Sequence, residues 1–250
     1  MKVAIITGGS RGIGKSAARE CGARGTGVIV TYNSHKPGAD EIVQEIESAG
    51  GKAVTLALDV GNTAAFPGFA AEVTRVLRET FERTSFDYLV NNAGFGVFIP
   101  MTDVSEQVFD SLFNVHLKGP FFLTQALLPL MADGGAILNV TSASTRVATA
   151  GVAPYASFKG GLEVLTRYMA KEFGDRRIRA NAISPGPIRT DLANGALDKY
   201  PEFAQLLASQ TALGRLGEAG DVGKMIASLL SDDHAWVNAQ TIEVGGGYMI

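Results

Sequence analysis

Short apolar runs rich in β-branched residues alternate along this chain with longer segments of helical periodicity. No Pro/Ser-rich or charged linker interrupts the alternation over the 250 residues. This pattern predicts a parallel sheet with helices on both faces. Crossovers between parallel strands are right-handed, so strands added in opposite directions along the sheet place their helices on opposite faces. We therefore expect one doubly wound α/β domain over residues 1–250. The expected strands are residues 2–6, 28–31, 53–58, 86–90, 136–141, 179–183 and 240–244.

Polar or glycine-rich segments follow four of these strands, at residues 7–14, 91–94, 142 and 185–190. Ligands of doubly wound sheets bind beyond the carboxyl ends of the strands, where the strand order reverses. We expect the four segments to line one cleft.

The first of these segments has the pattern T-G-x-x-x-G-x-G, with glycines at Gly8, Gly12 and Gly14. Glycines allow a tight turn and let the N–H groups at a helix N-terminus approach a diphosphate. The spacing departs from the more general G-x-G-x-x-G pattern, and a glycine turn can also be only a turn. Its position between the first strand and the first helix favours a nucleotide site.

Tyr155 and Lys159 are four residues apart in a segment of helical periodicity, so they share one helix face. A free phenol has a pKa of about 10. An ammonium about 4 Å away favours the phenolate by about 4 kcal/mol at an effective dielectric constant of 20. We therefore expect Lys159 to lower the pKa of Tyr155, so that the pair exchanges a proton near neutral pH. The alternative is an exposed tyrosine beside a solvated lysine.

Together with three further segments, these motifs resemble the short-chain dehydrogenase/reductase family, of the compact type, over nearly the whole chain. The further segments are Asn91-Asn92-Ala93-Gly94, Ile137 to Ser142, and Ser184 to Thr190. Within the family the chain is similar to 3-oxoacyl-(acyl-carrier-protein) reductases. The resemblance implies a Rossmann-like fold and hydride transfer between a nicotinamide and a carbonyl or secondary alcohol, as in a carbonyl reductase. The alternative is a catalytically silent NADP-binding sensor, although such proteins generally lack the tyrosine or the lysine.

The resemblance also implies roles for the catalytic residues. Tyr155 is the expected general acid/base, and Lys159 is expected to hold the nicotinamide ribose as well as tune Tyr155. Ser142 is expected to hydrogen-bond the developing alkoxide, a contact worth about 3 kcal/mol. Thr141, the neighbouring hydroxyl, should face the other way because side chains alternate along a strand.

His116 is a departure from the family, which usually has an asparagine here that holds a water in a proton relay to the lysine. Asn114 lies two positions earlier and would point about 160° away around a helix. A neutral histidine can both donate and accept a hydrogen bond. Either His116 takes over the asparagine's role, or the relay is rerouted and His116 is a packed helix residue.

The end of the second strand bears on the choice of cofactor. NAD-preferring relatives usually have an acidic residue there, whereas this chain has Tyr32, followed by Asn33 and Ser34. Arg11 in the glycine turn offers a cation for a 2′-phosphate. We therefore predict NADP, with NAD less favoured. The resemblance implies that the cofactor contacts are Gly8, Ser10, Arg11, Gly12, Ile13, Gly14, Tyr32, Asn33, Ser34, Asp59, Val60, Asn91, Ala93, Gly94, Tyr155, Lys159, Pro185, Gly186, Ile188 and Thr190.

The composition indicates few other partners. A net charge of −3 gives no reason to expect nucleic acid or an acidic membrane. Cys21 is the only cysteine, no His/Cys arrangement suggests a metal site, and no apolar run reaches membrane-spanning length. We expect a cytoplasmic protein and, by analogy with relatives, a homotetramer or homodimer.

The substrate is expected to be a small carbonyl or alcohol held under a variable lid at about residues 191–213, which includes Asn194. Phe95, Val97, Phe98, Ala148, Val152 and Tyr200 suggest an apolar pocket. Arg146 and Arg189 are candidates to bind a substrate carboxylate. Hydrophobic ketones, ketoacyl thioesters, sugars and polyols all remain open at this point.

Overall fold

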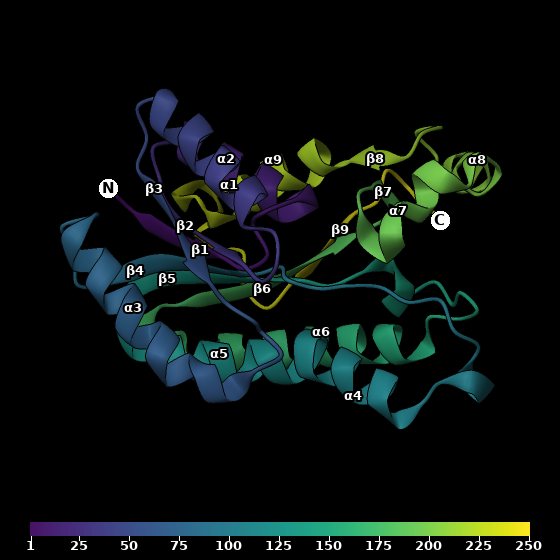
Figure 1. Ribbon diagram of the computed structural model, residues 1–250, viewed down its shortest axis with the longest axis horizontal. Helices are drawn as coiled ribbons and strands as arrows, with labels where there is room; N and C mark the ends of the chain where they lie inside the picture. Colours follow the sequence, from purple (N-terminus) through teal and green to yellow (C-terminus); the bar gives the residue numbers. More distant parts are fainter.

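The computed structural model describes residues 1–250, except for the side chains of Ala193, Asn194 and Ala196. Within the described residues, seven parallel strands form one sheet in the order β3-β2-β1-β4-β5-β6-β9 (Figure 1). The order reverses between β1 and β4. All seven expected strands are confirmed, and β5 begins earlier than expected. Their bounds are β1 Val3–Ile6, β2 Gly27–Tyr32, β3 Ala53–Ala57, β4 Phe86–Asn91, β5 Met131–Val140, β6 Arg179–Pro185 and β9 Thr241–Val244.

The strand β1 shows why the apolar runs become strands. Its four residues are all fully buried. Ala4 and Ile6 pack into the core on one face of the sheet, and Val3 and Ile5 pack into the core on the other. A strand covered on both faces needs apolar residues at every position rather than at alternate ones.

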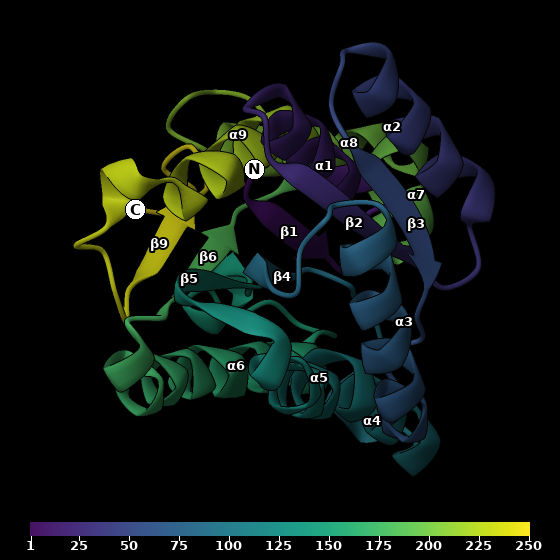
Figure 2. The same cartoon turned by 90° about the vertical axis from the view of Figure 1, so that its left-hand side faces the viewer.

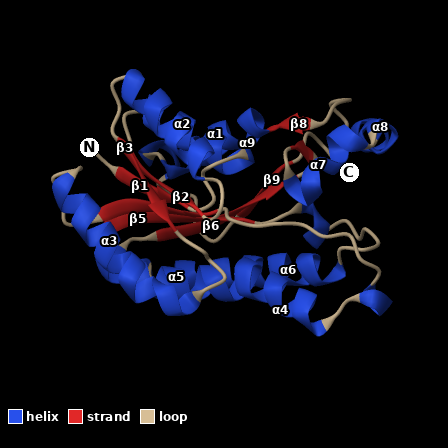
Figure 3. Ribbon diagram, viewed as in Figure 1, coloured by secondary structure: helices blue, strands red, loops and turns tan.

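Helices cover both faces of the sheet (Figures 1 and 3). Figure 2, which views the molecule from one end, shows the sheet between the two helical layers. One layer contains α1 Gly12–Ala23, α2 Lys36–Ser48 and α9 Ala219–Leu230. The other contains α3 Phe66–Glu79, α4 Glu106–Phe113, α5 Gly119–Leu127 and α6 Ala153–Glu172. The doubly wound α/β fold is therefore confirmed.

The expected lid contains two short helices, α7 Leu192–Lys199 and α8 Pro201–Ser209. They lie beyond the carboxyl ends of the central strands, at one end of the molecule (Figure 1). A small pair of strands that the sequence did not indicate, β7 Ile188–Arg189 and β8 Gly217–Glu218, flanks them. The Asn194 side chain lies outside the described residues. In the described part of the chain, no helix combines the length and the apolarity that a membrane crossing requires.

Candidate active site

The glycine turn between β1 and α1 requires glycine at positions where there is no room for a side chain. Gly8 has a φ of +64°, and a Cβ there would lie 2.8 Å from the Cα of Ala93. A Cβ on Gly14 would collide with the carbonyl oxygen of Gly8. Bare backbone at the first turn of α1 suits a diphosphate. The turn therefore fits the dinucleotide predicted from the sequence.

Thr7 joins the glycine turn to the segment after β4. Its hydroxyl oxygen accepts hydrogen bonds from the backbone N–H groups of Asn92, at 2.9 Å, and Ala93, at 3.0 Å. The Asn92 side chain donates back to the Thr7 carbonyl oxygen at 2.8 Å. These contacts hold Ala93 and Gly94 beside the turn. Neither Thr7 nor Asn92 was among the predicted contacts, although both lie within the motifs.

Asn91, by contrast, directs its side chain into the core. Its amide donates to Asn139 Oδ1 at 2.8 Å and to the Thr124 hydroxyl at 3.3 Å. The Asn91 side chain therefore links β4 to β5 and α5. A ligand could contact only the backbone of Asn91.

The segment after β6 reaches the glycine turn from the other side. A Cβ on Gly12 would lie 3.4 Å from Cγ2 of Thr190, so these two residues are neighbours. Gly186 approaches the backbone of Gly245 so closely that a Cβ would lie 2.7 Å from its Cα. This segment also lines the apolar cavity that contains Ser142 and Tyr155, called the main cavity from here on. Its residues in the cavity wall are Pro185, Gly186, Ile188 and Thr190.

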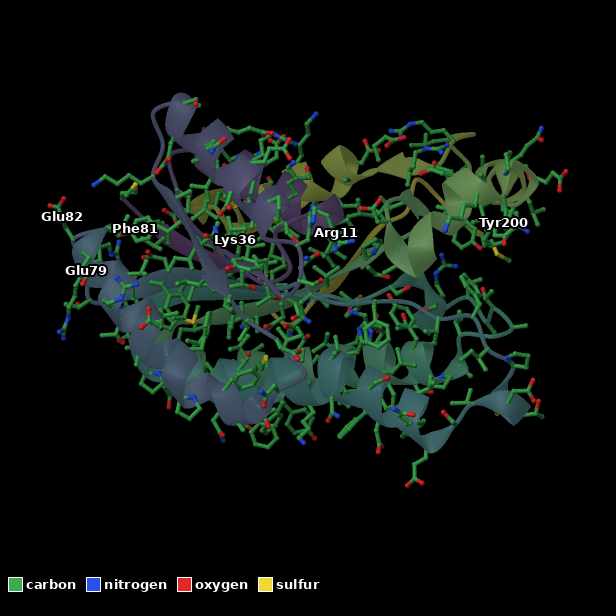
Figure 4. The ribbon with its side chains drawn as sticks, viewed as in Figure 1. Arg11, Lys36, Glu79, Phe81, Glu82 and Tyr200 are labelled. Atoms are coloured by element: carbon green, nitrogen blue, oxygen red, sulfur yellow. The ribbon has the colours of Figure 1, made fainter. Side chains whose placement is uncertain are left out.

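The predicted 2′-phosphate site lies at the end of β2. Tyr32 is its last residue, and Asn33 and Ser34 follow as exposed residues. Arg11 is exposed, and its guanidinium group makes no ion pair or hydrogen bond with any described residue; Figure 4 shows Arg11 near the middle of the molecule. Lys36, the first residue of α2, is a further cation that the sequence analysis did not select, and it pairs with Asp40 at 2.6 Å.

The predicted adenine contacts follow β3. Asp59 is exposed and accepts a hydrogen bond from the Gly61 N–H at 2.9 Å, while Val60 is buried. Ser10, in the glycine turn, is buried, and Ile13, in α1, is partly buried.

Ser142, Tyr155 and Lys159 meet at the carboxyl end of β5. Ser142 and Tyr155 both line the main cavity. Lys159 is only 4% exposed; its Nζ donates to the Val140 carbonyl oxygen at 2.7 Å and lies 5.6 Å from the centre of the Tyr155 ring. Thr141 faces away, as expected, and its hydroxyl donates to the Ile183 carbonyl oxygen.

The electrostatics of the pair differ from the prediction. Burial raises the pKa of Tyr155, and a hydrogen bond with the Ser142 hydroxyl partly opposes that rise. Burial also lowers the pKa of Lys159 to about 8. The expected lowering of the Tyr155 pKa by Lys159 is therefore wrong for this arrangement, because desolvation dominates both groups. A phenol with a raised pKa stays protonated at neutral pH and can serve as a proton donor.

His116 is buried against Tyr155 in a π-helical turn, Asn114–Lys118, between α4 and α5. Its ring lies edge-on to the Tyr155 ring, with centres 4.9 Å apart. Nε2 lies 2.8 Å from the Phe95 carbonyl oxygen, whereas Nδ1 is buried with no partner among the described residues. Burial, and secondarily the Lys159 charge, hold the pKa of His116 well below its usual range, so the ring is neutral.

The main cavity has a volume of about 200 Å³ and lies between Ser142 and Tyr155 on one side and the helices α7 and α8 on the other. Val97, Phe98 and Val152 line it as expected, and so do Phe203, Leu207 and Tyr248, which lie far along the chain. No charged side chain lines it among the residues that the structure describes. The prediction is wrong for Phe95, Ala148 and Tyr200, which are not part of its wall; Tyr200 is 63% exposed between α7 and α8 (Figure 4).

The two arginines considered for a substrate carboxylate are engaged elsewhere. Arg146 pairs with Glu243 and donates to the carbonyl oxygens of Tyr248 and Met249. Arg189 pairs with Asp198 on α7. The prediction that they bind a substrate carboxylate is not supported, because both guanidinium groups hold the lid and the C-terminal segment.

Comparison with known proteins finds relatives that match nearly the whole chain. The sequence model of the enoyl-(acyl carrier protein) reductase family matches residues 8–249. An uncharacterized oxidoreductase of Methylorubrum extorquens is 36% identical, over 98% of this chain and 97% of its own. The hydroxynaphthalene reductase-like protein Arp2 of Metarhizium brunneum is 34% identical, over 98% of this chain and 94% of its own.

Solved structures agree as well. The angucycline C-6 ketoreductase LanV with bound NADP is 34% identical, with a TM-score of 0.94 over 99% of this chain and 95% of its own. A second LanV structure holds NADP and rabelomycin; it is 33% identical, with a TM-score of 0.91 over 99% of this chain and 96% of its own. With the family pattern, the sheet order and the serine, tyrosine and lysine all in place, this chain belongs to the short-chain dehydrogenase/reductase family of oxidoreductases.

Proposed function

We propose that this protein is an NADP(H)-dependent ketoreductase that interconverts a carbonyl and a secondary alcohol. The observation that carries the proposal is that Ser142 and Tyr155 share the wall of one apolar cavity with the segment that reaches the glycine turn. The NADP bound to LanV and the reductase names of the relatives support the same cofactor and reaction.

The cofactor would be held along the four segments that follow the strands. The glycine turn from Gly8 to Gly14 suits the diphosphate, and Arg11 with Asn33 and Ser34 suits a 2′-phosphate. Asp59 and Val60 would border the adenine. Ala93, Gly94 and the segment from Pro185 to Thr190 would border the nicotinamide end.

When bound, NADPH supplies the hydride for the carbonyl carbon. The protein's own task is to place and protonate the carbonyl oxygen. Tyr155 donates the proton, since its phenol is protonated at neutral pH. The Ser142 hydroxyl donates a hydrogen bond to the same oxygen as negative charge develops there. Lys159 supplies an ammonium close to this charge while its own pKa, about 8, keeps it protonated at neutral pH.

His116 completes the site in this proposal, in place of the family's asparagine. A carbonyl oxygen only accepts, so Nε2 carries the ring proton and donates to Phe95. The neutral ring then presents Nδ1 as a buried acceptor, which costs about 1–3 kcal/mol unless a donor reaches it. A water that donates to Nδ1 and passes protons toward Lys159 meets this requirement.

The cavity favours an apolar, ring-bearing ketone over a sugar, a polyol or an acid. Its only polar side chains, among the described residues, are hydroxyls of Ser, Thr and Tyr. Phe98 and Phe203 meet edge-to-face across it, with ring centres 6.4 Å apart. Aromatic edges and faces of this kind suit a flat ring system. The names of Arp2 and LanV, and the rabelomycin in one LanV structure, indicate fused-ring substrates in similar proteins.

A homotetramer or homodimer is part of the proposal. Large apolar side chains on α4, α5 and α6 remain exposed, among them Phe109, Phe121, Phe122, Val164 and Tyr168. Single exposed apolar residues are ordinary, but several on adjoining helices suit burial against a second copy. Light scattering of the wild type and of Tyr168→Glu would test this. The cytoplasmic location stays a prediction.

The reductase proposal is tested with a panel of fused-ring, monocyclic and aliphatic ketones, following NADPH absorbance. We expect the fused-ring ketones to have the highest kcat/KM. Tyr155→Phe should lower kcat by about a thousandfold, whereas Tyr168→Phe, an exposed tyrosine on the same helix, should not. Tight NADPH binding without turnover of any ketone or alcohol would favour the sensor instead.

A further inference from the structure

Ser144 makes two contacts with the Ser142 hydroxyl. The backbone N–H of Ser144 donates to Ser142 Oγ at 3.2 Å, and the Ser144 hydroxyl lies 3.0 Å from the same oxygen. Both serines also line the main cavity. Of these two serines, only Ser142 was predicted from the sequence.

The number of bonds that a hydroxyl can form decides what these contacts do. A serine hydroxyl has one proton to donate and two lone pairs to accept with. The Ser144 hydroxyl has no other hydrogen-bond partner among the described residues, so its proton goes to Ser142 Oγ. Both lone pairs of Ser142 are then used, and its own proton must go to a third group.

Tyr155 lines the same cavity as Ser142 and is the candidate to meet that proton. The Ser142 hydroxyl stabilises the phenolate form of Tyr155, since its hydrogen bond lowers the pKa of that phenol. A substrate oxygen that enters between the two hydroxyls would meet the same proton. Hydrogen bonds in a chain also strengthen one another, so a Ser142 that accepts from Ser144 is a better donor.

The local fold holds this arrangement in place. Ser142 caps a short 3₁₀ turn, Ala143–Thr145, by accepting from Ser144. The Thr145 hydroxyl lies 2.8 Å from Oε1 of Glu163, on the same helix as Tyr155 and Lys159. The turn that carries Ser144 is thus tied to the helix that carries the proton donor.

We propose that Ser144 is a positioning residue, which fixes the Ser142 hydroxyl as a donor toward the substrate carbonyl oxygen. The inference rests on the proposed reductase function. Ser144 acts through Ser142 and need not touch the substrate, so its effect should disappear when the Ser142 hydroxyl is absent.

A double-mutant cycle tests this with NADPH and the best ketone of the panel. We expect Ser144→Ala to lower kcat about tenfold with KM within about twofold, and Ser142→Ala to lower kcat about a hundredfold. The double variant should match Ser142→Ala alone. Ser144→Thr, which keeps the hydroxyl, should restore most of the lost kcat. Ser157→Ala, whose hydroxyl bonds only its own helix at Ala153, is the matched control.

Two kinetic outcomes would overturn the proposal. A full kcat in Ser144→Ala would show that the contact does not orient Ser142, and losses that multiply in the double variant would show that Ser144 acts on its own.

A readout without substrate is the Tyr155 pKa, measured by tyrosinate absorbance with the signal of Tyr155→Phe subtracted. Ser144→Ala should raise that pKa, and an unchanged value would also contradict the inference. If the wild type reduces no ketone, the proposed function fails while this titration still decides the role of Ser144.

Discussion

Nε2 of His116 lies 2.8 Å from the carbonyl oxygen of Phe95, and this contact decides which ring nitrogen carries the proton. The other nitrogen, Nδ1, is left as a buried acceptor without a partner among the described residues, in a ring that packs against Tyr155. A side chain amide can present an acceptor in the same place, which relates this histidine to the asparagine that the family usually has.

The first prediction concerns this histidine. His116→Asn should keep kcat within about threefold of the wild type, because an amide oxygen can accept from the same water. His116→Leu should lower kcat about tenfold, because the relay loses its acceptor. Both variants are compared by kcat and KM between about pH 6 and pH 9. Full activity of His116→Leu over this range would identify His116 as a packing residue.

The second prediction concerns pH. The pKa of Lys159 is about 8, so its ammonium form is present below that pH and is lost above it. We expect kcat for ketone reduction to be highest below about pH 8 and to fall as the pH rises through that value. Lys159→Arg keeps its charge over the whole range. Its residual activity should therefore not fall at the same pH, and a decline identical to that of the wild type would assign the pKa to another group.

The third prediction concerns cofactor choice. Arg11→Ala should raise KM for NADPH about tenfold and leave KM for NADH nearly unchanged, because only NADPH carries the 2′-phosphate. Arg24→Ala is the matched control, since Arg24 follows the opposite end of the same helix. A wild type with a higher kcat/KM for NADH, unaffected by Arg11→Ala, would overturn the NADP assignment.

The fourth prediction concerns the contact between the first two motifs. Thr7→Val keeps the shape of the side chain but leaves the N–H groups of Asn92 and Ala93 without their acceptor. We expect a loss of about 2 kcal/mol in the free energy of unfolding, measured by urea denaturation, and weaker NADPH binding. Thr74→Val, whose hydroxyl bonds a carbonyl of its own helix, should cost much less. Equal losses in the two variants would show that Thr7 has no special part in the turn.

The main lines of the fold could be predicted because they depend on local patterns. A strand buried on both faces, such as β1, must be apolar at every position, and this is visible in the residues themselves. The same holds for Gly8 and Gly14, since a turn without space for a Cβ requires glycine. Ser142, Tyr155 and Lys159 were also predictable, because their spacing places them at a strand end and on one helix face.

Other features depend on what surrounds a residue. The apolar wall at Phe203, Leu207 and Tyr248 comes from segments far along the chain, which only folding brings to Ser142. The sequence does not show which groups Arg146 and Arg189 pair with. In the structure Arg146 pairs with Glu243, and Arg189 pairs with Asp198. The contacts of Ser144 with Ser142 likewise require the 3₁₀ turn that follows β5.

The sequence by itself determined the doubly wound sheet and the family, and it selected the candidate reacting groups, because strand burial, tight turns and helix spacing each leave a local pattern. Only the tertiary structure decided their electrostatic state. Desolvation raises the pKa of Tyr155 and lowers the pKa of Lys159 to about 8, so the tyrosine stays a protonated donor and the lysine is a weaker base than its spacing suggested. The burial of a side chain depends on all of its neighbours in the folded protein, so it cannot be predicted from the spacing of two residues along the chain.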